Sequence, residues 1–585
     1  MFQEFSSSLL LLSFLNNAIC TTAVPLRDCR CLPSDRCWPS IHEWDTLNKT
    51  VNGHLLQVRP VGSVCHGEQF DKVSCDDVRA SAYDSLWRIS EPGALQWSNW
   101  EGDETWGTCT SDSAREAPCR QGRLPLYAVM AQSAQEIQAA VQFAKRKNLH
   151  VAIRNTGHDP IGRSSGPGSL QINVSQLKKM HFMDEFTPQG GNQSQGQAVT
   201  LGAGVLGMEV LEAGRRRGVN VIAGTCSSVG ATGGFLQGGG VSLLSPAYGM
   251  AADNALEFTV VTAEGNVVVA NSFQNTDLFW ALRGGGGGTF GVVLDTTIRT
   301  FSDVPAVHLL ITTTIPRWNG TSPTAEEALW SITTEIINIL PALKRFDDTA
   351  SAIIVPVMAS ELVSLNAEIL FVNTSDLDAV QMQVTNLFEA LDCRRLPYKS
   401  NLTVYPHLST YFTRPRSMDW AGNGLIEGSV LVSEELFYQP NGTSTIMDVL
   451  SGLTFEAEDS VEILMAGGGQ VKANRGIINS ALLPAWRESA LLLAIRRALP
   501  PDSMAKSMRN IQLPALRSLE SRYMGSYLNV ADRDEPNYQR AFWGDSYSGL
   551  SRVKRKWDRD GLFTVNLGVG SEIWDREGIC RVKHS

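Results

Sequence analysis

Apolar and polar positions along residues 125–301 alternate in a way that predicts strands separated by helices. Residues 127–129 and 151–154 are short apolar runs with the length of buried strands. Between them, Ser133 and Glu136 have the spacing of a capping box and predict a helix that ends near Lys147. This alternation indicates a layered domain built around a sheet.

A second pattern begins after Pro305, with a strand at 308–315, a helix at 324–339 and a strand at 352–358. A chain of 585 residues exceeds what one hydrophobic core usually serves, so this pattern predicts a second domain. From about Tyr523 no long core pattern appears, and this segment is predicted to return to the first domain. We therefore expect a two-domain α+β fold, with a leader at 1–23, an extension at 24–122, a first domain at 123–303, a second at 304–522 and a returning segment at 523–585.

Cysteine usage indicates an oxidising compartment. Many cysteines crowd the N-terminal extension, whereas Cys226, Cys393 and Cys580 stand alone. Crowded, irregular spacing is typical of disulfides, and the zinc alternative lacks a C-x-x-C pair. The crowded cysteines are Cys29, Cys31, Cys37, Cys65, Cys75, Cys109 and Cys119.

The first residues have part of the pattern of a secretory signal. An apolar run at 9–15 is followed by small residues up to Ala23, although Glu4 stands where a signal carries Lys or Arg. The alternative is a buried N-terminal segment. No later apolar run is long enough to span a bilayer, so we expect a secretory-pathway protein, extracellular or luminal, without membrane insertion. Sequons for N-glycosylation occur at Asn48, Asn173, Asn192, Asn319, Asn373, Asn401 and Asn441.

Two glycine-rich segments are candidates for ligand contacts. Residues 202–207 match G-x-G-x-x-G between a strand-like and a helix-like run, which is the dinucleotide fingerprint. No acidic residue follows about twenty residues later, where the ribose contact belongs, so a tight strand-to-helix turn is the better interpretation. The glycines at 284–288 lack a following Gly-Lys-Ser/Thr, and their apolar flanks favour a buried turn beside a ligand over a flexible linker.

A histidine and a cysteine lie among small residues, where a ligand can approach the backbone closely. Residues 154–159 read Arg-Asn-Thr-Gly-His-Asp, and Cys226 stands in Gly-Thr-Cys-Ser-Ser-Val-Gly. With the Phe-Trp-Ala-Leu-Arg run before Gly284, these motifs resemble the berberine-bridge-enzyme-like FAD-linked oxidases of the vanillyl-alcohol-oxidase superfamily. The resemblance covers about residues 124–570.

This resemblance implies a PCMH-type FAD-binding domain and an α+β substrate domain, whose antiparallel sheet is covered by helices. It also implies that FAD is bound bicovalently, with His158 on the flavin 8α-methyl group and Cys226 on ring carbon C6. The alternatives are a structural histidine and a buried, inert cysteine. The cofactor-binding residues that the resemblance implies are Arg154, Asn155, Gly157, His158, Asp159, Gly162, Ser164, Cys226, Gly230, Gly234, Gly238 and Asn529. No metal ligand is expected.

Three positions depart from the family pattern and concern acid/base chemistry. Plant members of the family carry a Glu where this chain has Ala473. The family motif Y-x-N-Y has a second Tyr, and this chain has Val530 at that position. The family motif N-Y-x-x-L begins with Asn, and this chain has Ser546 there. Tyr527 is then the candidate for proton handling, with a packing aromatic as the alternative. A sugar oxidase must deprotonate a hydroxyl, so loss of the base costs it about 10²–10⁴-fold in rate. Oxidation of an amine or of an allylic carbon beside an indole can begin without so strong a base, because the nitrogen or the ring stabilises the developing cation.

The activity implied is hydride transfer from a substrate C–H bond to flavin N5, followed by reoxidation with O₂. Residues 44–53 and 428–431 look like fungal members, above all the FAD-linked oxidoreductases of ergot alkaloid assembly, which act on N-methyl-dimethylallyltryptophan at the chanoclavine stage. A secreted oligosaccharide oxidase and a flavin-binding protein without catalysis are the alternatives. A net charge of −10 argues against nucleic acid, so the expected partners are a small-molecule substrate and O₂.

Overall fold

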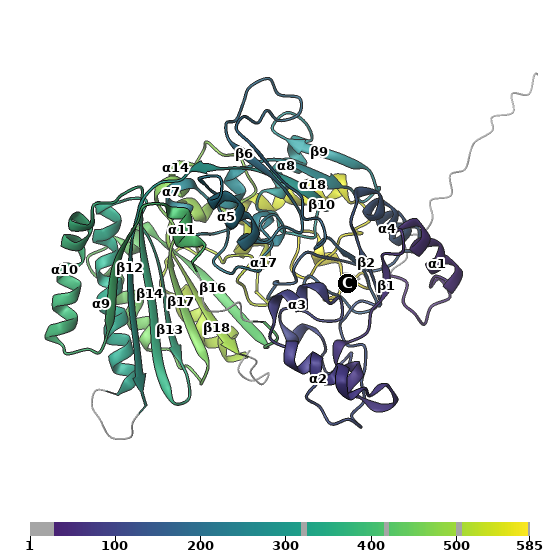
Figure 1. The fold of residues 1–585 in the computed structure, drawn as a ribbon, viewed down its shortest axis with the longest axis horizontal. Helices are drawn as coiled ribbons and strands as arrows, with labels where there is room; N and C mark the ends of the chain where they lie inside the picture. The colour runs from purple at the N-terminus through teal and green to yellow at the C-terminus, as the bar shows by residue number, and fades with distance from the viewer. Residues whose placement is uncertain (1–28, 318–323, 415–420, 499–505, 583–585) are drawn as a thin grey trace, which may run out of the picture.

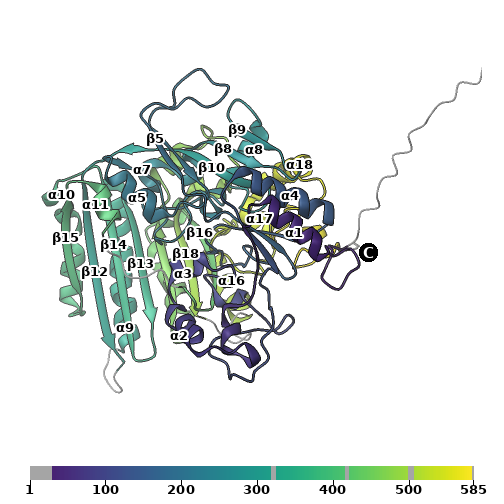
Figure 2. The ribbon, with the colours of Figure 1, turned by 45° about the vertical axis from the view of Figure 1, so that its right-hand side comes forward.

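The computed structural model describes residues 29–317, 324–414, 421–498 and 506–582, so the expected leader at 1–23 lies outside the described residues. Figures 1 and 2 show a sheet-rich unit flanked by long helices, packed beside a mixed unit that holds the N-terminal extension and the end of the chain. None of the helices in the described residues is long and apolar enough to cross a membrane.

The mixed unit contains two main sheets. One has the order β1-β2-β4-β3, with β1 antiparallel and the others parallel, and the second is antiparallel with the order β5-β6-β10-β8-β9. Helix α4 (Ala134–Lys147) begins as predicted, because the Ser133 side chain accepts a hydrogen bond from the Glu136 N–H. The strands are β1 (Leu55–Gln57), β2 (Tyr127–Met130), β3 (Val151–Arg154), β4 (Leu170–Asn173), β5 (Met180–Met183), β6 (Ala198–Gly202), β8 (Ala255–Val261), β9 (Val267–Asn271) and β10 (Val292–Arg299).

The glycine motif at 202–207 connects β6 with helix α5 (Gly207–Arg215). A Cβ at Gly204 would lie 2.3 Å from the carbonyl oxygen of Ser175, so the turn tolerates no side chain there. This close backbone approach explains the glycine without a dinucleotide, and agrees with the interpretation as a tight turn.

The sheet-rich unit is one antiparallel sheet with the order β15-β12-β14-β13-β17-β18-β16. Strands β16 and β17 are buried along their whole length because both of their faces are covered, whereas β15 at the edge is partly exposed. On β18, Leu493 and Ile495 pack with the helices, whereas Leu492 and Ala494 face the mixed unit. The strands are β12 (Ala306–Pro316), β13 (Ser351–Met358), β14 (Leu362–Val372), β15 (Lys399–Tyr405), β16 (Leu425–Ser433), β17 (Asp459–Met465) and β18 (Ser489–Ala498), and the covering helices are α9 (Ala325–Phe346), α10 (Leu377–Cys393) and α13 (Gly442–Ser451).

Helix α9 is longer than the pattern predicts. It continues past 339 through Pro341 to Phe346, because its apolar stripe remains buried against the sheet on both sides of the proline. Tertiary packing therefore outweighs the hydrogen bond that proline cannot donate.

The crowded cysteines form disulfides, as predicted. The pairs are Cys31–Cys37, Cys65–Cys75, Cys109–Cys119 and Cys29–Cys580. Cys580 therefore does not stand alone, since it ties the end of the chain to its beginning.

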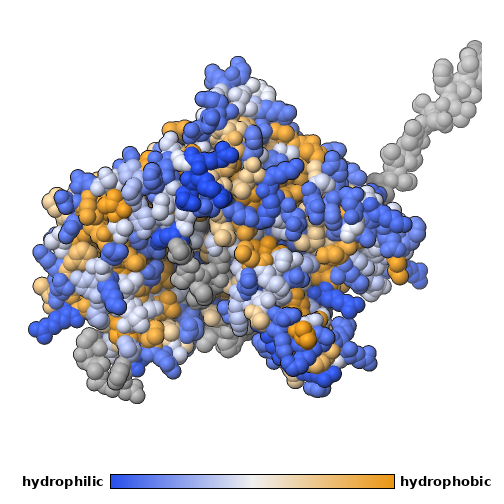
Figure 3. Space-filling model, in the orientation of Figure 1, coloured by the Kyte–Doolittle hydropathy of each residue, from blue (hydrophilic) through white to orange (hydrophobic). Residues whose placement is uncertain are grey.

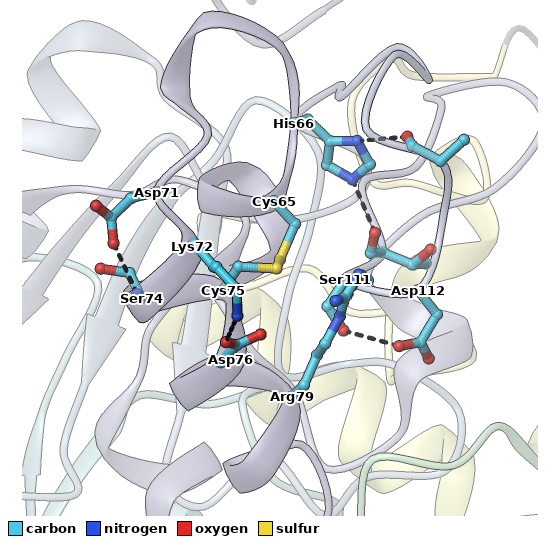
Figure 4. Close-up of a disulfide and its surroundings, with 12 residues drawn as sticks. Cys65, His66, Asp71, Lys72, Ser74, Cys75, Asp76, Arg79, Ser111 and Asp112 are labelled. Carbon is cyan, nitrogen blue, oxygen red and sulfur yellow. Dashed lines mark hydrogen bonds and ion pairs between the residues drawn. A yellow bond between two sulfur atoms is a disulfide. The ribbon is translucent and has the colours of Figure 1, made fainter.

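The extension carries helices α1 (Ile41–Thr50), α2 (Lys72–Ser81) and α3 (Ser85–Ser90). Figure 4 shows that both ring nitrogens of buried His66 face carbonyl oxygens, those of Thr110 at 2.8 Å and Ala114 at 3.1 Å. These contacts join the loop of the Cys65–Cys75 disulfide to the loop of the Cys109–Cys119 disulfide, so the extension has a defined structure without much secondary structure.

The segment after Tyr523 packs on the mixed unit. The Trp543 indole N–H donates to the Gly284 carbonyl at 2.9 Å, and the buried Lys554 ammonium donates to the Thr289 carbonyl at 2.6 Å. These two contacts flank the glycine run at 284–288 and hold it as a turn. Helices α17 (Tyr538–Trp543) and α18 (Tyr547–Trp557) supply both side chains.

One sequon cannot accept a glycan on the folded chain. Asn173 is fully buried, and its side chain accepts a hydrogen bond from the Ser175 N–H. Asn319 lies outside the described residues, and the sequon asparagines Asn192, Asn373, Asn401 and Asn441 are exposed. Figure 3 shows polar residues over most of one face, with apolar residues in scattered groups.

A buried ion pair connects the two units. The two terminal nitrogens of the Arg487 guanidinium, Nη2 and Nη1, donate to the Asp253 carboxylate at 2.6 and 2.7 Å. The Asn474 amide donates to the same carboxylate at 3.0 Å. Asp253 belongs to the short helix η4 (Ala251–Asn254) of the mixed unit, and Arg487 belongs to η5 (Pro484–Glu488), which precedes β18. This pair sets how the sheet meets the mixed unit.

We predict that Arg487→Ala lowers the free energy of unfolding by about 3–5 kcal/mol, because it leaves the Asp253 carboxylate buried without its cation. Denaturant titration followed by tryptophan fluorescence measures the change. The matched control is Arg475→Ala, which removes an exposed partner of Glu488 and should cost less than about 1 kcal/mol. Equal losses in the two variants would contradict a special role for the buried pair.

Candidate active site

A large cavity lies where the mixed unit meets the sheet. It encloses about 1430 Å³, with the open space at its mouth included. Four segments of the mixed unit line it: the loop after β3, the loop at 224–243, the glycines around 287–291 and residues 527–530. Strands β17 and β18 close it from the sheet with Glu462, Leu464 and Arg496.

Most of the predicted site residues line this one cavity, although they come from segments far apart in the sequence. They are Asn155, Gly157, His158, Asp159, Ser164, Cys226, Gly230, Gly234, Tyr527 and Asn529. Three other predicted residues, Arg154, Gly162 and Gly238, do not line it.

These three residues need a correction, because each supports the wall from behind. The Arg154 guanidinium is fully buried and donates to the carbonyls of Arg88 and Glu91 at the end of α3, away from the cavity. A Cβ at Gly162 would lie 2.3 Å from the Trp100 ring, and one at Gly238 would lie 2.4 Å from the Asn529 amide. A position close to His158 or Cys226 in the sequence therefore does not mean that the residue contacts a ligand.

The cavity wall is shaped to admit a flat ligand against backbone. The Asn155 side chain packs on Gly230 and Gly233, where a Cβ would lie 2.2 and 2.5 Å from its amide nitrogen. That nitrogen donates to the Ala203 carbonyl at 2.5 Å, whereas the buried Asn155 Oδ1 has no hydrogen-bond partner among the described residues. An unpaired buried oxygen beside side-chain-free backbone fits a ligand N–H, as a flavin would offer.

His158 and Cys226 both line this cavity. His158 is also held by a contact from the N-terminal extension, which contains none of the motifs described above. Its Nε2 lies 2.6 Å from Ser228 Oγ, and the Trp97 indole N–H donates to its carbonyl at 3.0 Å. The rings of Trp97 and His158 meet edge to face, with centroids 6.0 Å apart. Trp97 belongs to the Cys-rich extension, which has no periodicity from which such a contact could be predicted.

Tyr527 is buried against the cavity wall. Its hydroxyl oxygen accepts hydrogen bonds from the Asn529 amide at 3.0 Å and the Val241 N–H at 3.4 Å. Burial raises the pKa of Tyr527, which keeps the phenol protonated and makes it a poor base. Its position suits a hydrogen-bond donor better than the proton acceptor that the sequence analysis expects.

The sheet contributes charged residues that the sequence analysis misses. Arg496 on β18 donates from Nε to Glu427 on β16 at 3.0 Å, and from Nη1 to Glu462 on β17 at 2.5 Å. Two carboxylates thus share one guanidinium, all on the sheet face that borders the cavity. The signal in the sequence is a charged residue inside an apolar strand, since such residues are buried only when paired.

Two of the three departures from the family pattern lie away from the cavity. Ala473 is exposed at the end of α14 (Gly469–Ala473) and does not line the cavity, nor does Ser546. Burial raises the pKa of Glu427 to about 7, although this residue lies behind Arg496 and is not among those that line the cavity. Val530 does line the cavity, where the family pattern has a larger tyrosine.

Comparison with known proteins agrees with this geometry. A family model described as "FAD binding domain" matches residues 125–271, and one described as "Berberine and berberine like" matches residues 526–570. The flavin-dependent oxygenase ucdF of Aspergillus ustus is 63% identical over 92% of this chain and 99% of its own length. The FAD-linked oxidoreductases malF of Malbranchea aurantiaca and easE of Arthroderma otae are 40% and 39% identical, each over 94% of this chain and over 94% and 91% of their own lengths.

Solved structures show the same fold. The VAO-type flavoprotein MtVAO615 of Myceliophthora thermophila C1 is 31% identical, with a TM-score of 0.81 over 95% of this chain and 100% of its own. Berberine bridge enzyme from Eschscholzia californica is 15% identical, with a TM-score of 0.64 over 90% of this chain and 98% of its own, and shows the fold alone. The chain belongs to the berberine-bridge-enzyme-like FAD-linked oxidoreductases. The predicted two-domain α+β fold is confirmed, and the protein is an FAD-dependent enzyme rather than a binding protein without catalysis.

We predict that Glu427 makes stability depend on pH. Because the folded pKa of about 7 lies above the ordinary 4.5, the carboxyl group stabilises the folded state fully below pH 4.5 and loses this contribution as pH rises through 7. Glu427→Gln, which is neutral throughout, should lack this loss. The free energy of unfolding of the wild type should therefore fall relative to the variant by about 1–3 kcal/mol between pH 5 and 8.

Denaturant titrations at several pH values measure this difference, and Glu456→Gln, at an exposed carboxylate, is the control. A wild type that gains stability over Glu427→Gln as pH rises would contradict the raised pKa.

Proposed function

We propose that the enzyme oxidises a cationic amine that carries a bulky apolar group, as an N-methylated, prenylated tryptophan does. The observation that carries this proposal is the carboxylate of Glu462 on the cavity wall, whose cation Arg496 is shared with a second carboxyl group, that of Glu427. An ammonium group would complete the pairing of these carboxylates.

The apolar part of such a substrate would contact apolar side chains of the cavity. Leu464 on β17 and Val530 on the returning segment line the same cavity. Valine in place of tyrosine leaves room for an indole or prenyl group, and both side chains would exclude water from it. A carbohydrate, which needs many hydrogen-bond donors and acceptors, would bury its hydroxyl groups against these side chains at a cost.

The residues that would hold FAD are those of the cavity wall in the mixed unit. Asn155 Oδ1 would accept from the ring, the glycines at 230, 233 and 234 would let it lie against backbone, and His158 and Cys226 would tether it covalently. When bound, FAD accepts the hydride that the substrate C–H bond loses, and O₂ takes up the electrons.

A second candidate function, oxygenation, is favoured by the relative ucdF, which is named a flavin-dependent oxygenase. An oxidase releases the oxygen as H₂O₂, whereas an oxygenase places one oxygen atom in its product. Turnover under ¹⁸O₂ with mass analysis of the product separates these two functions.

We also infer passage through the secretory pathway, to the exterior or to an endomembrane lumen. The support is the set of four disulfides within the described residues, since such bonds persist in oxidising compartments.

We predict that the flavin stays with the protein after acid precipitation, since two covalent bonds would hold it. Mass mapping should locate flavin on the peptides that contain His158 and Cys226. His158→Ala and Cys226→Ala alone should each retain one bond, and the double variant should release its flavin into the supernatant. Complete release from the wild type would disprove covalent attachment.

For the substrate, we predict that prenylated N-methyl tryptophans reduce the flavin anaerobically, whereas glucose and cello-oligosaccharides do so at least about 100-fold more slowly. Glu462→Gln should raise KM for the cationic substrate about tenfold, the effect of one charged hydrogen bond. A neutral N-acyl analogue of the same substrate is the control and should show no such change. Rapid reduction by the sugars alone would overturn the proposed substrate class.

A further inference from the structure

One exposed glycosylation sequon lies on the outer edge of the seven-stranded sheet. Residues 401–403 of β15 read Asn-Leu-Thr, and Asn401 is exposed. We propose that Asn401 carries an N-linked oligosaccharide, and that this glycan shields the outer edge of β15 from pairing with a strand of another chain. The proposal rests on the proposed passage through the secretory pathway, where such glycans are added.

The two edges of this sheet have different surroundings. The end strands are β15 and β16, and β16 is buried along its whole length. The first residues of β15, 399–401, are exposed, and Figure 2 shows this strand at the outer side of the sheet, away from the mixed unit. Among the described strands β15 pairs with β12 alone, so its other side presents backbone N–H and C=O groups that a further strand could pair with.

The composition of β15 makes this edge prone to pairing. Natural edge strands are commonly protected by charged residues, above all lysine, or by proline. In β15 the only charge is at its first residue, Lys399, and residues 400–405 read Ser-Asn-Leu-Thr-Val-Tyr, without charge, proline or glycine. Thr, Val and Tyr favour strands. An uncharged, strand-forming segment of this length on an exposed edge promotes association between chains unless something covers it.

The polar side chains of the sequon point away from the covering helices. Residues two apart in a strand share one face, and the Asn401 amide donates to the Thr403 hydroxyl at 3.1 Å. Leu402, which lies between them, packs with the core beneath helices α9 and α10, as does Val404. Asn401 therefore lies on the opposite face of the sheet, where the half-buried Leu310 of β12 is its partner in register.

This part of the sheet face has room for a bulky polar group. Thr312 of β12 is half-buried, and Thr314 of β12 and Asn366 of β14 are exposed. These polar residues lie on the same face as Asn401, because Thr312 pairs with both Lys399 and Asn366. A glycan at Asn401 would extend over this polar surface without displacing a buried side chain.

The modification needs a donor that the secretory pathway supplies, an oligosaccharide linked to a lipid diphosphate. Transfer forms a bond between the Asn401 amide nitrogen and the anomeric carbon of the first sugar, and breaks the bond from that carbon to the diphosphate. The amide loses one proton and the lipid diphosphate leaves, so no oxidant or reductant is needed. The attached sugars then occupy the space beside β15 that an approaching strand would need.

The first test locates the glycan on the full chain secreted from a yeast host. Enzymatic release of N-linked glycans in H₂¹⁸O turns each glycosylated asparagine into an ¹⁸O-labelled aspartate, which peptide mass mapping detects. The peptide that contains Asn401 should be labelled in the wild type and in Thr403→Ser, which keeps the sequon. It should be unlabelled in Thr403→Ala, which removes the sequon and leaves Asn401 in place.

The second test measures association between copies by sedimentation velocity. Asn401→Gln and Thr403→Ala should form larger species than the wild type and Thr403→Ser, because their β15 edge lacks the glycan. Asn401→Lys also lacks the glycan but places a charge on the edge, and should sediment as the wild type does. The matched control is Asn441→Gln, which removes a sequon at the start of α13 instead of on a strand and should change nothing. Melting temperatures close to that of the wild type show that the variants are folded.

The outcomes separate this proposal from the one on which it rests. An unlabelled Asn401 in a chain labelled at Asn192 or Asn441 would overturn the proposal while passage through the secretory pathway stands. A chain without label at any sequon would contradict both. Sedimentation of Asn401→Gln that matches the wild type, with Asn401 labelled in the wild type, would overturn the shielding role.

Discussion

The pairing of Asp253 with Arg487 is the constraint on which the site depends. The cavity exists because the seven-stranded sheet meets the mixed unit at a fixed angle, and this buried ion pair joins the two units at that junction. The bidentate geometry adds directional specificity to the apolar packing between the two units, in which Leu492 and Ala494 of β18 take part. Arg496 and Glu462 therefore face the ligand cavity rather than solvent, although nothing in their own strands specifies what lies opposite.

The architecture was largely predictable from the sequence because apolar spacing and turn residues are local properties. Strand β3 and helix α4 begin and end within a residue of the predicted positions. His158 and Cys226 could also be placed in one cavity, since each stands in a motif that resembles a known family. The error at Arg154 has a local cause as well, because the last residue of a strand can point to the face opposite the loop that follows it.

The carboxyl groups beside Arg496 and the contact that holds His158 could not be predicted, because they depend on which distant residues become neighbours. Glu427 and Arg496 are opposite each other only through the register of β16 and β18. Trp97, which donates to the His158 carbonyl, comes from an extension held by disulfides instead of a periodic core, so no pattern marks it. Long-range pairing, rather than composition, decides the chemistry of this site.

The disulfide between Cys29 and Cys580 has a consequence for the order of events during synthesis. Its partners are 551 residues apart, so Cys29 is made roughly half a minute to two minutes before Cys580 at usual rates of translation. During that time Cys29 must avoid bonding with Cys31 or Cys37, its close neighbours. The native pairing can form only after Cys580 has been made, so this bond closes late and reports that the N-terminal extension is correctly joined.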